Sequence, residues 1–180
     1  MPGDMPLLRV QAKPIRATLI RRHLCPDGTD PTRARLVCLT SGNAGAALVA
    51  EGLAPVIVGP GGGMTATRWW TPGEIRQTWP DHFDATSGHL PLPLVAALGR
   101  ALRDRLGPLP PAVEVPTGSG ETILALSWAY PGTRLVAVTH LDDHTDHHDE
   151  MPLWDVIRSR FEVRRADTGH TVQLCANLHT

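Results

Sequence analysis

Twice along the chain, a short apolar run leads into a glycine-rich turn and then into an alanine- or leucine-rich stretch. The first instance is the run at residues 35–40 (RLVCLT), the turn SGNAG and a stretch that ends near Glu51. The second is the run at residues 112–115 (AVEV), the turn PTGSG and residues 121–129. Such runs predict strands and such turns predict chain reversals before helices. A further apolar run follows each helix, at residues 55–58 and 134–138, and predicts another strand.

The remaining segments carry weaker patterns. A helix is predicted for residues 93–106, where leucine and valine recur at helical spacing. Residues 64–92 contain several prolines and the tryptophans Trp69, Trp70 and Trp79, and they predict an irregular insertion or the remnant of a small mobile domain. Residues 154–161 predict a short helix, and residues 171–174 a last strand.

Strands that alternate with helices predict an α/β fold. We expect a three-layer arrangement, with a mostly parallel sheet and helices on both faces. The length of 180 residues, 42% of them hydrophobic, suits a single α/β domain over residues 1–180. Ligands of such sheets gather at the carboxyl ends of the strands. Both glycine turns fall at such ends.

Composition narrows the class of partner. The formal net charge is −1 and no basic block occurs, which argues against nucleic acid and membrane surfaces. No apolar stretch is long enough to span a bilayer, so we expect a cytoplasmic protein with a small-molecule ligand. Three cysteines without CxxC spacing, Cys25, Cys38 and Cys175, indicate thiols rather than a disulfide framework or a zinc finger.

The second turn, PTGSGET, has the composition of an anion-binding loop. Glycines let the backbone approach a phosphate, and the free N–H groups at a helix start favour negative charge. In nucleotide-binding P-loops a similar string continues with lysine, but here that position is Glu121. A carboxylate there would repel nucleotide phosphates, so NTP hydrolysis is disfavoured. A turn that only starts a helix is the alternative.

The first turn, with Thr40, Ser41, Gly42 and Asn43, closely resembles the Ser/Thr-Ser-Gly-Asn-x-Gly loop of fold type II (tryptophan synthase β-like) pyridoxal phosphate-dependent enzymes. That family includes threonine synthase, cysteine synthase and D-cysteine desulfhydrase. Its Schiff-base lysine lies upstream of this loop, and its phosphate-binding glycine loop lies downstream. Here Lys13, the single lysine among sixteen arginines, precedes Ser41 by 28 positions, about the family spacing. The resemblance covers about residues 8–140.

The resemblance implies an enzyme of amino-acid metabolism with pyridoxal 5'-phosphate as cofactor. Lys13 would be the catalytic residue, forming the Schiff base with the cofactor and then removing the substrate α-proton. The reaction would be β-elimination or β-replacement, of the lyase or synthase type. The substrate-binding residues would be Thr40, Ser41 and Gly42. The other cofactor-binding residues would be Asn43, Thr117, Gly118, Ser119, Gly120 and Thr122.

The chain departs from the family in length and at Glu121, where many relatives have a neutral residue. It would be a shortened member, and a homodimer or a partner chain that completes the site stays open. A noncatalytic cofactor-binding remnant is one alternative. Another is a divalent-metal protein that uses the cluster of residues 140–148, although a solvated loop without metal is favoured. The last alternative is an interaction module built on the tryptophan-rich segment.

Overall fold

The computed structural model describes residues 5–39, 43–58, 70–139 and 153–166. The chain divides into two compact units, which we call unit 1 (residues 1–12 and 95–180) and unit 2 (residues 13–94). Each unit contains a three-stranded parallel sheet with helices. The predicted α/β class and the parallel pairing are therefore confirmed. The strands belong to two small sheets, however, where the sequence analysis predicts one.

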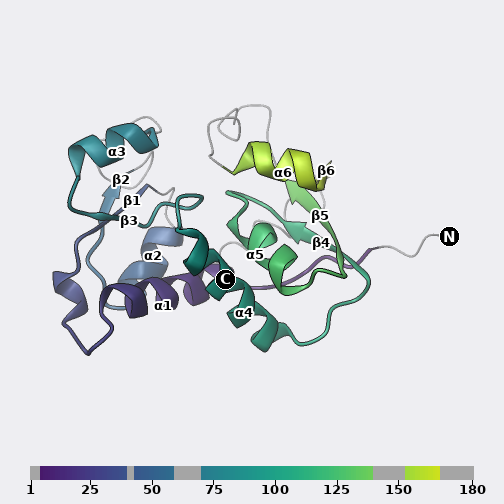
Figure 1. Cartoon of the computed structure of the whole chain (residues 1–180), viewed down its shortest axis with the longest axis horizontal. Helices are drawn as coiled ribbons and strands as arrows, with labels where there is room; N and C mark the ends of the chain where they lie inside the picture. The colour runs from purple at the N-terminus through teal and green to yellow at the C-terminus, as the bar shows by residue number, and fades with distance from the viewer. Residues whose placement is uncertain (1–4, 40–42, 59–69, 140–152, 167–180) are drawn as a thin grey trace. The chain divides into compact units, whose positions relative to one another are not determined.

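The sheet of unit 2 has the strand order β2-β1-β3, and all its pairs are parallel. Its strands are β1 (Leu36–Leu39), β2 (Val56–Val58) and β3 (Phe83–Asp84). Its helices are α1 (Ala12–Leu24), the 3₁₀ helix η1 (Pro31–Arg33), α2 (Asn43–Ala50) and α3 (Pro72–Thr78) (Figure 1). The sequence β1-α2-β2 is a parallel crossover, as the first strand, turn and helix pattern predicts.

Apolar side chains on the strands of unit 2 form its core together with α3. The buried members are Val37, Leu39, Val58 and Ile75. Trp70 and Trp79 pack against them with ring centroids 5.3 Å apart. Both tryptophans thus contribute to packing while staying partly exposed, and Trp69 lies outside the described residues.

Helix α3 is absent from the sequence-based prediction, which treats residues 64–92 as irregular. The described part of these residues contains the helix α3 and the strand β3, so it is not wholly irregular, and whether it is the remnant of a small domain stays a prediction. The helix starts with a reciprocal cap: the Thr71 hydroxyl accepts from the Glu74 N–H at 3.2 Å, and the Glu74 carboxylate accepts from the Thr71 N–H at 2.8 Å. This capping box supplies partners for two N–H groups that a helix start leaves open.

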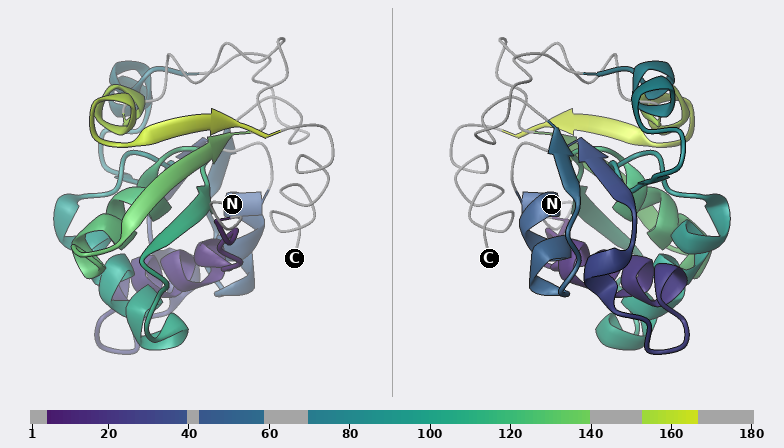
Figure 2. Two further views of the ribbon diagram at one scale, coloured as in Figure 1. Left: turned by 90° about the vertical axis from the view of Figure 1, so that its right-hand side faces the viewer. Right: turned by 90° about the vertical axis from the view of Figure 1, so that its left-hand side faces the viewer.

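The sheet of unit 1 has the strand order β4-β5-β6, again entirely parallel. Its strands are β4 (Ala112–Pro116), β5 (Arg134–Thr139) and β6 (Glu162–Arg165), and its helices are α4 (Leu92–Leu106), α5 (Glu121–Ala129) and α6 (Trp154–Arg160). Figure 2 shows the three strands side by side with their arrowheads at the same end. The chain near Leu7 pairs with Glu114 and covers the outer edge of β4.

Two glycines of unit 1 allow helices to approach closely. A Cβ atom on Gly99 of α4 would collide with the Ala125 carbonyl of α5. Gly120 has φ +93°, and a Cβ there would lie 2.8 Å from Ile157 of α6. The packing of α6 therefore depends on a glycine immediately before α5.

Most elements with a strong local pattern form where they are predicted: β1, α2, β2, α4, β4, α5, β5 and α6. The helix α1 and the strand β6 were not predicted. The predicted strand at 171–174 and the loop at 140–150 lie outside the described residues. Whether the two units make up one domain stays a prediction.

Candidate functional site

Lys13 is the second residue of α1 and is half-buried. Pro14 follows it in the first helical turn, where a missing N–H removes no helical hydrogen bond. Burial, and then the positive charge of Arg16 one turn further along, lower the pKa of Lys13, while the Cys38 thiol acts in the opposite direction. A lysine with a lowered pKa holds more of the neutral amine, which is the nucleophilic form.

Arg16 connects α1 to the chain that follows β3. Its side chain is only 4% exposed, and its guanidinium donates to the Ala85 carbonyl at 2.7 Å. The Cys38 thiol contacts the same carbonyl at 3.5 Å. Because Cys38 lies in β1, these contacts bring α1, β1 and the end of β3 together within unit 2.

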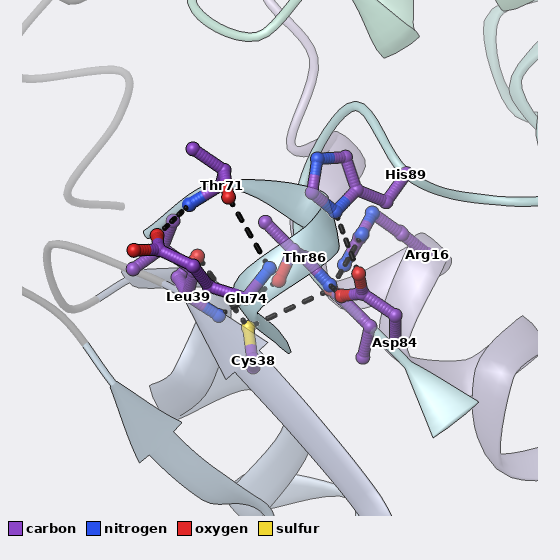
Figure 3. A network of polar contacts seen from close by, with 9 residues as sticks. Arg16, Cys38, Leu39, Thr71, Glu74, Asp84, Thr86 and His89 are labelled. Carbon is purple, nitrogen blue, oxygen red and sulfur yellow. Dashed lines mark hydrogen bonds and ion pairs between the residues drawn. The ribbon is translucent and has the colours of Figure 1, made fainter. Parts of the chain in front are cut away.

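A carboxylate–histidine pair lies beside this contact (Figure 3). Asp84 is the last residue of β3, and its Oδ2 lies 2.6 Å from the Nδ1 of His89. The other carboxylate oxygen, Oδ1, accepts from the Thr86 N–H at 2.9 Å. Burial raises the pKa of Asp84, but hydrogen bonds from His89 and Thr86 more than offset it, so the pKa is lowered overall. Asp84 is therefore a fixed carboxylate at neutral pH.

The threonine of this segment reaches the end of β1. The Leu39 N–H donates to the Thr86 hydroxyl oxygen at 2.9 Å. Leu39 is the last residue of β1, and the next residues, Thr40, Ser41 and Gly42, lie outside the described ranges. Asn43 follows as the first residue of α2 and is half-buried. The predicted asparagine thus starts a helix just beyond the carboxyl end of a buried strand, in the same unit as Lys13.

The PTGSG turn connects β4 to α5 in unit 1. Thr117 is buried, its N–H donates to Val138 and its hydroxyl donates to the Val115 carbonyl at 2.8 Å. Gly118 is exposed, and a Cβ there would meet nothing within 4 Å. Its carbonyl accepts from the Trp154 indole N–H at 2.8 Å. The start of the turn is therefore held by Thr117 and by the Gly118 carbonyl, with open space at the Cβ position of Gly118.

The turn has some, but not all, of the features that favour binding of a phosphate. No hydrogen bond joins the N–H groups of Gly118, Ser119 or Gly120 to another residue in the part of the chain that is described. Such N–H groups before a helix are suitable partners for an anion. Against this, Glu121 is 3% exposed at the first position of α5, where its charge opposes a bound anion. Thr122, the last predicted phosphate contact, is half-buried.

Lys13 and Asn43 belong to unit 2, and the predicted phosphate residues belong to unit 1. The local sequence pattern indicates neither the structural contact of Arg16 nor the Asp84–His89 pair. One signal was present: an aspartate two residues before a threonine is typical of a side-chain-capped turn.

No family model, curated protein or solved structure matches this chain.

Metal chemistry finds no support within the described ranges, where no three His, Cys, Asp or Glu side chains gather into a metal-binding group. The cluster at 140–148 lies outside them. Among the residues described, Cys38 is buried and Cys25 is half-buried, both as free thiols. No helix in those ranges has the length and apolar character needed to cross a membrane.

Proposed function

We propose that this chain binds pyridoxal phosphate through Lys13 and catalyses β-elimination or β-replacement on an amino acid. The observation that carries the proposal is the environment of Lys13, which is half-buried and has its pKa lowered by burial and by Arg16. An amine in this state would hold the cofactor through its aldehyde carbon, and it would be the group that accepts the substrate α-proton. Bound pyridoxal phosphate supplies an electron-withdrawing ring that stabilises negative charge at the α-carbon.

The other residues have separate tasks in this proposal. Asn43 donates its side-chain amide to the cofactor's ring oxygen, and Thr40, Ser41 and Gly42 bind the substrate carboxylate. Within unit 1, the N–H groups of Gly118 and Ser119 are the candidate phosphate donors, since no residue of the described ranges bonds to them. The finer architecture, an abbreviated fold type II enzyme, belongs to the same proposal. The two parallel α/β units support it only as a class.

The test uses the fact that Lys13 is the only lysine. Purified protein is incubated with pyridoxal phosphate, dialysed, and examined for the visible absorption of lysine-linked cofactor. Borohydride then fixes the group, and peptide mass spectrometry locates it. We expect one pyridoxyl group on the peptide with Lys13, and none in Lys13→Ala.

A matched control separates this site from general amine reactivity. The double variant Lys13→Ala, Arg22→Lys restores one lysine on the same helix at an exposed position. It should fold and yet carry no cofactor. Equal loading of Lys13→Ala and wild type would refute the proposal. So would a pyridoxyl group on the introduced lysine of the control that is as abundant as the group on Lys13 of the wild type.

A further inference from the structure

We propose that Glu51 is a positioning residue for Lys13, because it binds a threonine hydroxyl that would otherwise bend the first turn of α1. This inference rests on the proposed function and deepens it, since Lys13 is the residue that would hold the cofactor. The threonine is Thr18, and all the groups involved belong to unit 2.

The Thr18 hydroxyl lies in the middle of α1, within reach of two acceptors. The carboxylate oxygen Oε1 of Glu51 is at 2.7 Å, and the carbonyl oxygen of Pro14, one turn earlier in the same helix, is at 3.0 Å. A threonine hydroxyl carries one hydrogen, and its bond to a carboxylate is shorter and stronger than its bond to a neutral carbonyl. The hydroxyl therefore donates mainly to Glu51, at the expense of Pro14.

Helix α3 offers a comparison for a threonine and the carbonyl of its own helix. The Thr78 hydroxyl donates to the Glu74 carbonyl, which is also four residues earlier, at 2.8 Å. For Thr18 the corresponding distance is longer, 3.0 Å, and the shorter contact is the one to Glu51. A threonine that donates to the carbonyl four residues earlier often bends its helix. Glu51 thus prevents a bend in α1.

The bend would affect the helical turn that carries Lys13. Pro14, whose carbonyl would accept the hydroxyl, is the next residue in the chain. Arg16 is buried and is anchored to a carbonyl outside the helix, so the part of α1 before it would take up the change. Glu51 directly follows α2, whose first residue is Asn43. The helix of one candidate cofactor residue therefore supplies the acceptor that keeps the helix of the other straight.

An ion pair is the simpler role for Glu51. Its oxygen Oε2 lies 3.5 Å from Nη1 of Arg21, and the two side chains are 24% and 49% exposed. Ion pairs with this exposure contribute little to stability. Removal of the arginine charge should therefore leave Lys13 as in wild type, which makes Arg21→Gln the matched control.

The test is a cycle of variants, read at the only lysine of the chain. It compares wild type, Glu51→Ala, Thr18→Val, the double variant of these two, and Arg21→Gln. Attachment of pyridoxal phosphate is stopped with borohydride at set times, and mass spectrometry of the Lys13 peptide gives the rate. A second reading needs no cofactor: trace acetic anhydride acetylates Lys13, and the rate is compared with that of a short lysine peptide in the same solution.

For Glu51→Ala we expect attachment to be slower by about ten- to hundredfold, the cost of misplacing a reacting group by up to roughly 1 Å. The acetylation rate of Lys13 should rise, because the displaced amine is less buried. Valine at position 18 cannot donate to Pro14, so Thr18→Val and the double variant should both match wild type in the two rates. Such a rescue by a second substitution is not expected of a contact that only stabilises the fold.

The outcomes separate this inference from the proposed function. A double variant that attaches the cofactor as slowly as Glu51→Ala overturns the role of Glu51, and so does a Glu51→Ala variant with the acetylation rate of wild type. An Arg21→Gln variant that loses as much as Glu51→Ala also overturns it. A wild type that takes up no pyridoxal phosphate overturns the proposed function, while the acetylation rates still decide the role of Glu51. Should Glu51→Ala fail to fold, Glu51→Gln must show the same effect in smaller degree, again removed by Thr18→Val.

Discussion

Gly120, which precedes α5, is the position where one added methyl group should be most informative. Its φ of +93° lies in the left-handed region that favours glycine. A Cβ there would meet Ile157 Cγ1 at 2.8 Å and Cδ1 at 3.1 Å. Gly118, two residues earlier, has no positive φ and open space around its Cβ position. The two glycines of one turn thus serve different purposes.

The expected loss for Gly120→Ala has two parts. Holding a residue with a Cβ in the left-handed region costs about 1–2 kcal/mol. Overpacking against a buried side chain such as Ile157 adds about 1–3 kcal/mol. The free energy of unfolding should therefore fall by about 2–5 kcal/mol, a large part of the roughly 5–15 kcal/mol typical of a domain. Gly118→Ala should stay within about 0.5 kcal/mol of wild type.

Urea unfolding followed by circular dichroism measures both variants, with the slope of each transition checked against wild type. Equal and small losses would refute the argument, because the helix would then tolerate a Cβ at Gly120 by shifting. A second readout concerns function: Gly118→Ala should weaken pyridoxal phosphate binding without lowering stability. A Gly118→Ala variant that binds the cofactor as tightly as wild type would contradict the phosphate role of the turn.

Two further predictions concern unit 2. Asp84 has a lowered pKa, so the stability it contributes is present above its unfolded pKa of about 3.9 and is lost as the pH falls through the folded pKa. In urea titrations below about pH 5, Asp84→Asn should therefore lose less stability with falling pH than wild type. An unchanged dependence of the unfolding free energy on pH would contradict this. Asp81→Asn, which changes an exposed residue nearby, is the control for the lost charge. Thr71→Ala should lower the free energy of unfolding by about 0.5–2 kcal/mol, because the cap of α3 is lost. Thr71→Ser keeps the hydroxyl and should retain most of that free energy. Equal losses in the two variants would show that the hydroxyl is not the cause.

The local sequence pattern was sufficient to predict an element wherever residues adjacent in the chain determine its secondary structure. The helix α4 repeats apolar residues at helical spacing, and α5 begins directly after a glycine turn. The cap of α3 was also present in the sequence, as Thr71 followed three residues later by Glu74, but the prolines around it favoured a loop. Lys13, Asn43 and the PTGSG turn could be selected as candidates because motif and spacing are local properties.

Tertiary structure decided what depends on distant partners. The strand β6 has four exposed residues and no alternation, and its only reason to be a strand is its pairing with β5. The division of the strands between two sheets is likewise a matter of which strands meet. The contact of Arg16 with Ala85 joins residues 69 positions apart, and Thr86 reaches Leu39 over 47 positions. No local periodicity encodes such contacts, because they form only once burial has brought the segments together. The sequence alone therefore determined Lys13 as a candidate, and only the fold revealed the Asp84–His89 pair in the same unit.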